Sequence, residues 1–189
     1  DREETQPVPV AAKPAKPGSA LADYTAKDMV TDRAKPRQAE EIAAFITRLS
    51  GGKTSLTRMD VMGLFGEKAF MLLYISNQLV GVVGWQVENL VARVDEVWLE
   101  SGINQSEALK VVMSAIERAS KELQAEALLV FVDPEQAADT RLWQPLKYMI
   151  HTVEQLEIDA WKEAARESQP PDTLIFFKQL RVDRVLRPI

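Results

Sequence analysis

Apolar residues recur at helical spacing in several stretches of the chain. In residues 39–49, for example, Ile42, Phe45 and Leu49 fall on one face, and a pair of glycines comes directly after them. An apolar stripe of period 3.6 that ends at glycine is typical of a helix packed on a core. The same pattern predicts helices over residues 39–49, 56–65, 104–123, 134–146 and 159–167.

Between these stretches lie shorter segments rich in β-branched and aromatic residues. AFMLLYIS, residues 69–76, is too short and too β-rich for a helix, and two-residue polar turns separate it from two similar segments. These three predict an antiparallel meander. The wholly apolar LLVFV, residues 128–132, predicts a central buried strand. The complete set of predicted strands is 69–76, 79–87, 90–99, 128–132, 149–156 and 173–180.

Mixed helices and strands predict one α/β (α+β) domain over residues 36–189. Residues 1–35 differ, because four prolines interrupt a stretch rich in Ala, Lys and Glu that has no sustained hydrophobic period. Such a segment buries too little apolar surface to offset its ordering entropy, so we predict a Pro-rich tail or linker. Two interpretations stay open: a plain linker, or a tail that docks on a partner or sister chain.

Charge and composition exclude several kinds of site. Asp and Glu outnumber Lys and Arg by 28 to 23, and a net charge of −5 is not typical of a nucleic-acid surface. The chain has no cysteine, and its single histidine, His151, excludes a multi-histidine zinc site, so we expect no metal. No segment approaches the roughly 18 consecutive apolar residues of a membrane helix. We therefore predict a cytoplasmic protein that binds neither nucleic acid nor membrane.

The predicted order of two helices, a three-strand meander, helix, strand, helix and two strands is similar to that of the GNAT superfamily of N-acetyltransferases. The segment ISNQLVGVVGW, residues 75–85, resembles the hairpin between the second and third strands of that family. The resemblance implies a mixed, mostly antiparallel sheet flanked by helices. It also implies acetyl-CoA or another acyl-CoA as cofactor, and transfer of the acyl group to an amine.

In GNAT enzymes the fourth strand leads into a loop of pattern Arg/Gln-x-x-Gly-x-Gly/Ala. Backbone N–H groups of this loop approach the cofactor's diphosphate, and side chains would block them. Counting back without gaps from residues 128–132 places Asn104 at the Arg/Gln position and Glu107 and Leu109 at the two small-residue positions. If acyl-CoA binds, the resemblance implies contacts from Leu99, Gly102, Asn104, Gln105 and Ser106.

A second family pattern, Ala-x-x-x-Leu-Tyr-x-x-Leu-Gly-Phe, is matched loosely by ADTRLWQPLKY, residues 138–148. The family's Tyr often protonates the departing CoA thiolate. Trp143 stands at that position, and an indole N–H is not a usable acid. Tyr148, at the Phe position, is then the candidate proton donor. The alternative is a core or interface role for both aromatic side chains.

Asp95 and Glu96 lie on the third strand of the meander, where GNAT enzymes often place a general base. Successive residues of a strand face opposite sides of the sheet, so only one of them faces the cleft. Glu96 is expected to share a face with Val94 and Trp98, which would desolvate its carboxylate. Glu96 is therefore the candidate base, and an exposed carboxylate on a strand is the alternative.

Glu107, Leu109 and Trp143 depart from the enzymatic pattern at three chemically demanding positions. Our leading hypothesis is a GNAT-like domain that has altered or lost acyl-CoA use and serves protein binding or assembly, with a protein partner or a homo-oligomer and no bound cofactor. The expected contact elements are the tail and the C-terminal residues 181–189, where Arg and apolar residues alternate. One alternative is an atypical acyl-CoA-dependent N-acetyltransferase. Another is a small-molecule sensor that uses the cleft of the same fold.

Overall fold

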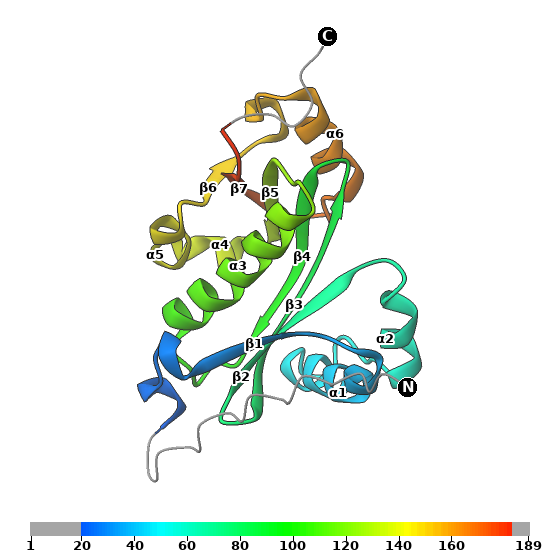
Figure 1. The fold of residues 1–189 in the computed structure, drawn as a ribbon, viewed down its shortest axis with the longest axis vertical. Coiled ribbons are helices and arrows are strands. Elements are labelled where there is room, and N and C mark those ends of the chain that lie inside the picture. Colours follow the sequence, from blue (N-terminus) through cyan, green and yellow to red (C-terminus); the bar gives the residue numbers. More distant parts are fainter. Residues whose placement is uncertain (1–19, 183–189) are drawn as a thin grey trace, which may run out of the picture.

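The computed structural model describes residues 20–182, which form a mixed sheet covered by helices on both faces (Figure 1). The strands of this part are β1 (Met29–Arg33), β2 (Ala69–Ile75), β3 (Gln78–Glu88), β4 (Val91–Leu99), β5 (Ala127–Val132), β6 (Met149–His151) and β7 (Leu174–Gln179). Their order in the sheet is β1-β2-β3-β4-β5-β7-β6, and every neighbouring pair is antiparallel except β4 and β5. This confirms the predicted α/β (α+β) class with a mostly antiparallel sheet.

The helices divide between the two faces of the sheet (Figure 1). The α-helices are α1 (Ala39–Leu49), α2 (Arg58–Leu64), α3 (Gln105–Glu122), α4 (Pro134–Ala138), α5 (Thr140–Trp143) and α6 (Asp159–Ser168). Short 3-10 turns are η1 (Leu21–Asp23), η2 (Ala26–Asp28), η3 (Pro36–Gln38), η4 (Gln144–Leu146) and η5 (Val153–Gln155). Helices α3 and α5 pack on one face, and α1, α2 and α6 pack on the other. Each strand presents alternate residues to these two cores, as the period of two requires.

The predicted domain boundary at residue 35 is wrong for the described part of the tail. Residues 29–33 form an edge strand, with Met29 opposite Ile75 and Arg33 opposite Met71. Tyr24 and Met29 are buried beside the start of α3 and hold this segment to the sheet. The hydrophobic pattern of this strand is weak, because a five-residue edge strand with one buried face needs few apolar residues. Residues 1–19 of the predicted tail lie outside the described residues, as do residues 183–189 of the predicted contact segment.

Two other predicted elements are shorter than expected. The helix predicted over residues 134–146 is interrupted at Asp139, whose ψ of 72° leaves helical geometry, and Pro145 lacks the N–H that a continued helix would need. The strand predicted over residues 149–156 ends at His151. A 3-10 turn begins after Thr152, and the Thr152 N–H donates to the Gln155 side chain. This local bond takes the place of a hydrogen bond to a neighbouring strand.

A β-bulge in β4 decides the geometry of the middle of the sheet. Gly84 pairs with Glu96 while Trp85 pairs with Val94, so Asp95 is an extra residue on β4. The bulge reverses which face the later residues of the strand occupy. Val94 packs under α3, whereas Trp98 packs on the α1 side. The prediction that Glu96 shares a face with Val94 is therefore wrong, and Glu96 shares its face with Trp98 alone.

Beside this bulge the sheet opens. Strands β4 and β5 pair only from Val91–Ala127 to Val94–Val130, and the pairing ends there although both strands continue. Residues 96–99 of β4 keep their partners on β3 but have none on the β5 side within the described range. A parallel sheet that splays in this way leaves a strand edge exposed at its centre.

Candidate functional site

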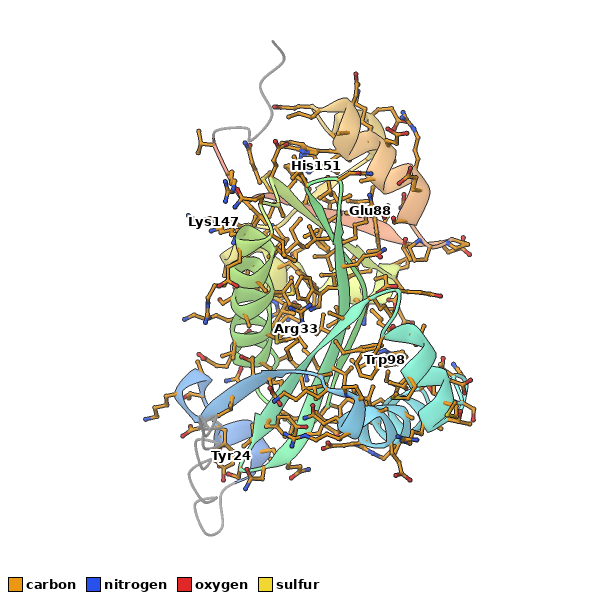
Figure 2. All side chains as sticks on the ribbon, turned by 45° about the vertical axis from the view of Figure 1, so that its right-hand side comes forward. Tyr24, Arg33, Glu88, Trp98, Lys147 and His151 are labelled. Atoms are coloured by element: carbon orange, nitrogen blue, oxygen red, sulfur yellow. The ribbon has the colours of Figure 1, made fainter. Side chains whose placement is uncertain are left out.

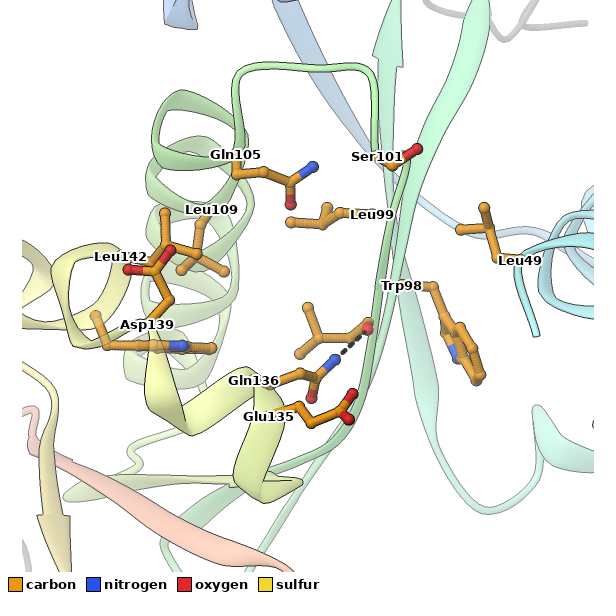
Figure 3. Close-up of a pocket in the computed structure, with 12 residues that line it drawn as sticks. Leu49, Trp98, Leu99, Ser101, Gln105, Leu109, Glu135, Gln136, Asp139 and Leu142 are labelled. Carbon is orange, nitrogen blue, oxygen red and sulfur yellow. Dashed lines mark hydrogen bonds between the residues drawn. The ribbon is translucent and has the colours of Figure 1, made fainter. Parts of the chain in front are cut away.

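A pocket of about 530 Å³ lies where β4 separates from β5 (Figure 3). It is lined by the end of α1, the last residues of β4, the start of α3, and the α4–α5 segment. The lining residues are Leu49, Val97, Trp98, Leu99, Ser101, Gln105, Leu109, Glu135, Gln136, Asp139, Leu142 and Trp143. Because Val97 and Trp98 face opposite sides of the sheet, the pocket reaches both faces through the gap. Two reactants can therefore meet there from opposite sides.

The free edge of β4 forms one wall of this pocket. The Val97 carbonyl accepts a hydrogen bond of 3.4 Å from Nε2 of Gln136, across the gap that β5 would fill in a continuous sheet (Figure 3). An exposed strand edge binds extended, amide-containing ligands through backbone hydrogen bonds. The Gln136 amide occupies such a position, so the protein's own side chain bonds there to the edge of β4.

The start of α3 forms the second wall and has few free donors. The Asn104 side chain caps the helix and accepts from the Glu107 N–H at 3.2 Å, and the Asn104 carbonyl accepts from the Ala108 N–H. The N–H groups of Gln105 and Ser106 are the ones left in the first turn. The Glu107 carboxylate turns to the N-terminal segment and accepts from the Ala26 N–H at 2.9 Å. Glu107, which stands at the position of the family's first motif glycine, therefore binds the backbone of the chain's own N-terminal segment.

The structure divides the five predicted cofactor residues into three groups. Leu99 and Gln105 line the pocket, and Gln105 also donates to the Glu100 carbonyl. Asn104 is a helix cap. Gly102 and Ser106 are exposed and lie outside the lining. Contact of these residues with a cofactor stays a prediction.

Sequence reasoning missed the contribution of α4. Glu135, Gln136 and Asp139 line the pocket from this helix and its end, and Pro134 opens the helix directly after β5. The second family pattern begins at residue 138 of this chain, so it includes neither Glu135 nor Gln136. Glu135 and Asp139 make the pocket acidic, and among residues 20–182 no lysine or arginine lines its wall.

The candidate base Glu96 lies one side chain behind the pocket wall. Its Oε1 accepts from Nε1 of Trp98 at 2.8 Å, and Trp98 lines the pocket beside α1 and α2 (Figures 2 and 3). Lys68 pairs with Glu96 and lies 3.1 Å from Oδ2 of Asp95. Gly84 leaves room for this cluster, since a Cβ there would lie 2.8 Å from Cγ of Glu96.

The cluster is partly removed from water. Burial raises the pKa of the Asp95 carboxyl. Burial lowers the pKa of Lys68, but the charges of Glu96 and Asp95 outweigh this effect, and the net change is upward. The stabilisation that Lys68 supplies is therefore present below pH 10.5, its unfolded value, and is lost as the pH rises through its higher folded value.

Replacing Lys68 with methionine should lower the free energy of unfolding at pH 7 by about 1–2 kcal/mol. Two neighbouring carboxylates then lack their cation, although the partial exposure of Asp95 reduces the cost. The deficit should shrink as the pH falls toward the carboxyl range, because protonation removes the repulsion. Urea denaturation across this range measures it. Lys110→Met, on the exposed side of α3, is the matched control, and an equal, pH-independent loss in both variants would contradict the prediction.

Tyr148 does not occupy the position that the predicted acid requires. Its side chain is 0% exposed, it does not line the pocket, and its hydroxyl finds no hydrogen-bond partner in the described part of the chain. Burial and the charge of Glu117 raise its pKa, which makes it a weaker acid. Lys147, just before it, has a φ of 67°, the conformation that explains the family's glycine at this position.

The neighbouring Trp143 has a double role. Its ring stacks on Phe176 at 5.1 Å and meets the Tyr148 ring edge-on at 5.6 Å, so it belongs to the core. It also lines the pocket. The core role was the expected alternative for both aromatics, and the structure places both in that core.

Tyr148→Phe should leave any activity unchanged and raise the free energy of unfolding by up to about 1 kcal/mol. The change removes a buried hydroxyl that has no partner among the described residues, so its desolvation cost disappears while the packing stays. Thermal unfolding and initial rates measure the two effects. Tyr74→Phe is the control, since the Tyr74 hydroxyl bonds to Glu41 and Gln38 and its loss should destabilise. A large loss of rate in Tyr148→Phe with intact stability would restore the acid role.

Solved structures share this backbone arrangement. A Salmonella typhimurium protein whose structure contains acetyl-CoA as cofactor superposes with a TM-score of 0.61 at 9% identity, covering 82% of this chain and 96% of that chain. A GNAT acetyltransferase from Streptococcus pneumoniae gives 0.58 at 15% identity, covering 80% and 98%. An N-acetyltransferase from Thermoplasma acidophilum in complex with coenzyme A gives 0.57 at 8% identity, covering 80% and 98%. The domain has the GNAT fold.

The likeness lies in the backbone, since the sequence matches no protein-family model and no curated protein. In this GNAT-like domain the pocket occupies the gap between the two central parallel strands. Within residues 20–182, no three His, Asp or Glu side chains come together as metal ligands. No helix of that same range has the length and apolarity needed to cross a membrane.

Proposed function

We propose that this domain is an atypical acyl-CoA-dependent N-acetyltransferase. The end of the β4–β5 pairing at Val94–Val130 carries the proposal, because it opens a pocket that joins both faces of the sheet. Structures of the same fold contain acetyl-CoA or coenzyme A. These observations favour the enzymatic alternative over the binding or assembly role expected from Glu107, Leu109 and Trp143.

The residues present fit the acyl-pantetheine part of such a cofactor. The free β4 edge at Val97 and the Gln136 amide would hold its amide groups, and Leu109 and Leu142 would contact its apolar parts. When bound, the thioester supplies an activated acyl group. Glu96 is the proposed base and accepts the proton of the amine through water, while Lys68 and Trp98 hold its carboxylate in place. Cationic amines suit the acidic wall formed by Glu135 and Asp139.

Calorimetry of the purified protein with acetyl-CoA, and then assays of thiol release with a panel of amines, test this proposal. Micromolar binding together with amine-dependent thiol release would support it. Binding without release under any amine would favour the sensor alternative. No binding of acetyl-CoA or of longer acyl-CoAs would favour the binding or assembly alternative. A protein partner or homo-oligomer stays a prediction, which light scattering with and without residues 1–19 tests.

A further inference from the structure

We propose that this site recognises its acyl donor through the acyl-pantetheine arm and gains little binding free energy from the nucleotide diphosphate. The inference rests on the proposed function and narrows it to a class of donor. The two ends of the site differ in which part of an acyl-CoA they suit. The strand edge and Gln136 suit the arm, whereas the start of α3 does not suit a diphosphate.

The helix start has fewer free donors than a diphosphate cradle uses. A phosphate cradle uses several successive backbone N–H groups at a helix N-terminus. Here the Glu107 N–H is bonded to the Asn104 side chain and the Ala108 N–H to the Asn104 carbonyl. Asn104 thus takes up the third N–H of the turn, and a ligand is left with the N–H groups of Gln105 and Ser106.

Charge around this turn is also unfavourable for phosphates. The Glu107 carboxylate, bonded to the Ala26 N–H and outside the pocket lining, adds a negative charge to the first turn of α3. Glu135 and Asp139 add two more carboxylates in the opposite wall, and no lysine or arginine of the described chain lines the pocket to offset them. Arg48 approaches the β4–α3 turn, but it pairs with Glu100 there.

Leu109 closes the same region sterically. It stands at the second small-residue position of the family pattern, is 2% exposed, and lines the pocket. Its side chain occupies space next to the helix that glycine or alanine would leave open. The same side chain adds apolar contact for a pantetheine arm. Leucine in place of a small residue therefore favours binding of the arm over binding of the nucleotide.

The donor chemistry that remains is a pantetheine thioester. It has three sources: the end of an acyl-CoA, a free acyl-pantetheine, and the prosthetic arm of an acylated carrier protein. All three present the same amides and the same thioester to β4 and Gln136. They differ only in the group attached to the far end of the arm, and this site does not hold that group.

Calorimetry of the wild-type chain with four probes tests the proposal. The probes are acetyl-CoA, S-acetyl-4′-phosphopantetheine, S-acetylpantetheine and an acetylated carrier protein. We expect the dissociation constants of acetyl-CoA and S-acetylpantetheine to agree within about threefold, whereas a diphosphate cradle would separate them by about tenfold for each charge-assisted hydrogen bond. Tighter binding of the carrier protein than of S-acetylpantetheine would identify the carrier as the source, and equal binding would identify the free arm; both support the proposal.

A charge variant gives an independent measurement. Glu107→Gln keeps an acceptor for the Ala26 N–H and removes the charge, so acetyl-CoA should bind about two- to fivefold tighter while S-acetylpantetheine is unchanged. Glu122→Gln changes the net charge equally at the exposed far end of α3 and should affect neither probe.

The outcomes separate this inference from the proposed function. If acetyl-CoA binds more than about tenfold tighter than S-acetylpantetheine, the nucleotide is recognised and the inference is wrong, while the acyltransferase proposal stands. An unchanged preference in Glu107→Gln would likewise count against it. If none of the four thioesters binds, the proposed function itself fails.

Discussion

Replacing Gln136 with tryptophan is expected to weaken thioester binding by at least about 100-fold, which corresponds to roughly 3 kcal/mol. Gln136 is exposed on α4 and reaches across the gap to the Val97 carbonyl. An indole at this position would cover the free edge of β4 and fill the space between β4 and α4. Since the Gln136 side chain is not part of the core, thermal stability should stay near that of the wild type. Calorimetry with acetyl-CoA and with S-acetylpantetheine measures the loss.

The matched control is Gln144→Trp. Gln144 is exposed on η4 and does not line the pocket, so the same substitution there should leave binding intact. Wild-type affinity in folded Gln136→Trp would place the thioester elsewhere and remove the main support for the acyltransferase proposal.

Replacing Trp85 with alanine is expected to lower the free energy of unfolding by about 3–5 kcal/mol. The side chain is 1% exposed, packs in the core under α3, and lies beneath the guanidinium of Arg33 at 5.5 Å. It also pairs with Val94 next to the bulge, so its loss removes packing where the sheet begins to open. Urea denaturation gives the value, and the pocket should lose affinity together with stability.

Trp85→Phe separates packing from the polar group. The indole N–H of Trp85 is buried without a partner in the described residues, so phenylalanine removes an unsatisfied donor while keeping most of the apolar surface. We expect a loss below about 1.5 kcal/mol. An alanine variant that costs no more than the phenylalanine variant would show that this side chain does not carry the packing assigned to it.

Most of the fold was predictable because the signals are local. The helical stripe of residues 39–49, the strand at residues 69–76 and the apolar run at residues 128–132 each depend on residues close together in sequence. The structure confirms α1, β2 and β5 at these places. The edge strand β1 was missed since its pairing with β2 joins residues about 40 positions apart, and its own five residues carry little pattern.

The site was predictable in part. The turn after β4 was located by counting along the chain, and Leu99 and Gln105 do line the pocket. Tyr148 was the candidate acid because of its spacing in the family pattern. The structure packs it against Trp143 in the core, and burial together with the charge of Glu117 raises its pKa. Gln136 was missed because its importance depends on the Val97 carbonyl, 39 residues earlier.

The sequence by itself determined the order of the main helices and strands that follow β1, and the chemistry at Glu107, Leu109 and Trp143, because residue identity and local period need no tertiary information. Only the tertiary structure decided that Asp95 forms a bulge, that β4 leaves β5 after Val94, and that Glu107 binds Ala26. These features arise from pairing between segments distant in the chain. Their free energy comes from contacts that form only when the sheet and its helices are assembled, and the pocket is the result.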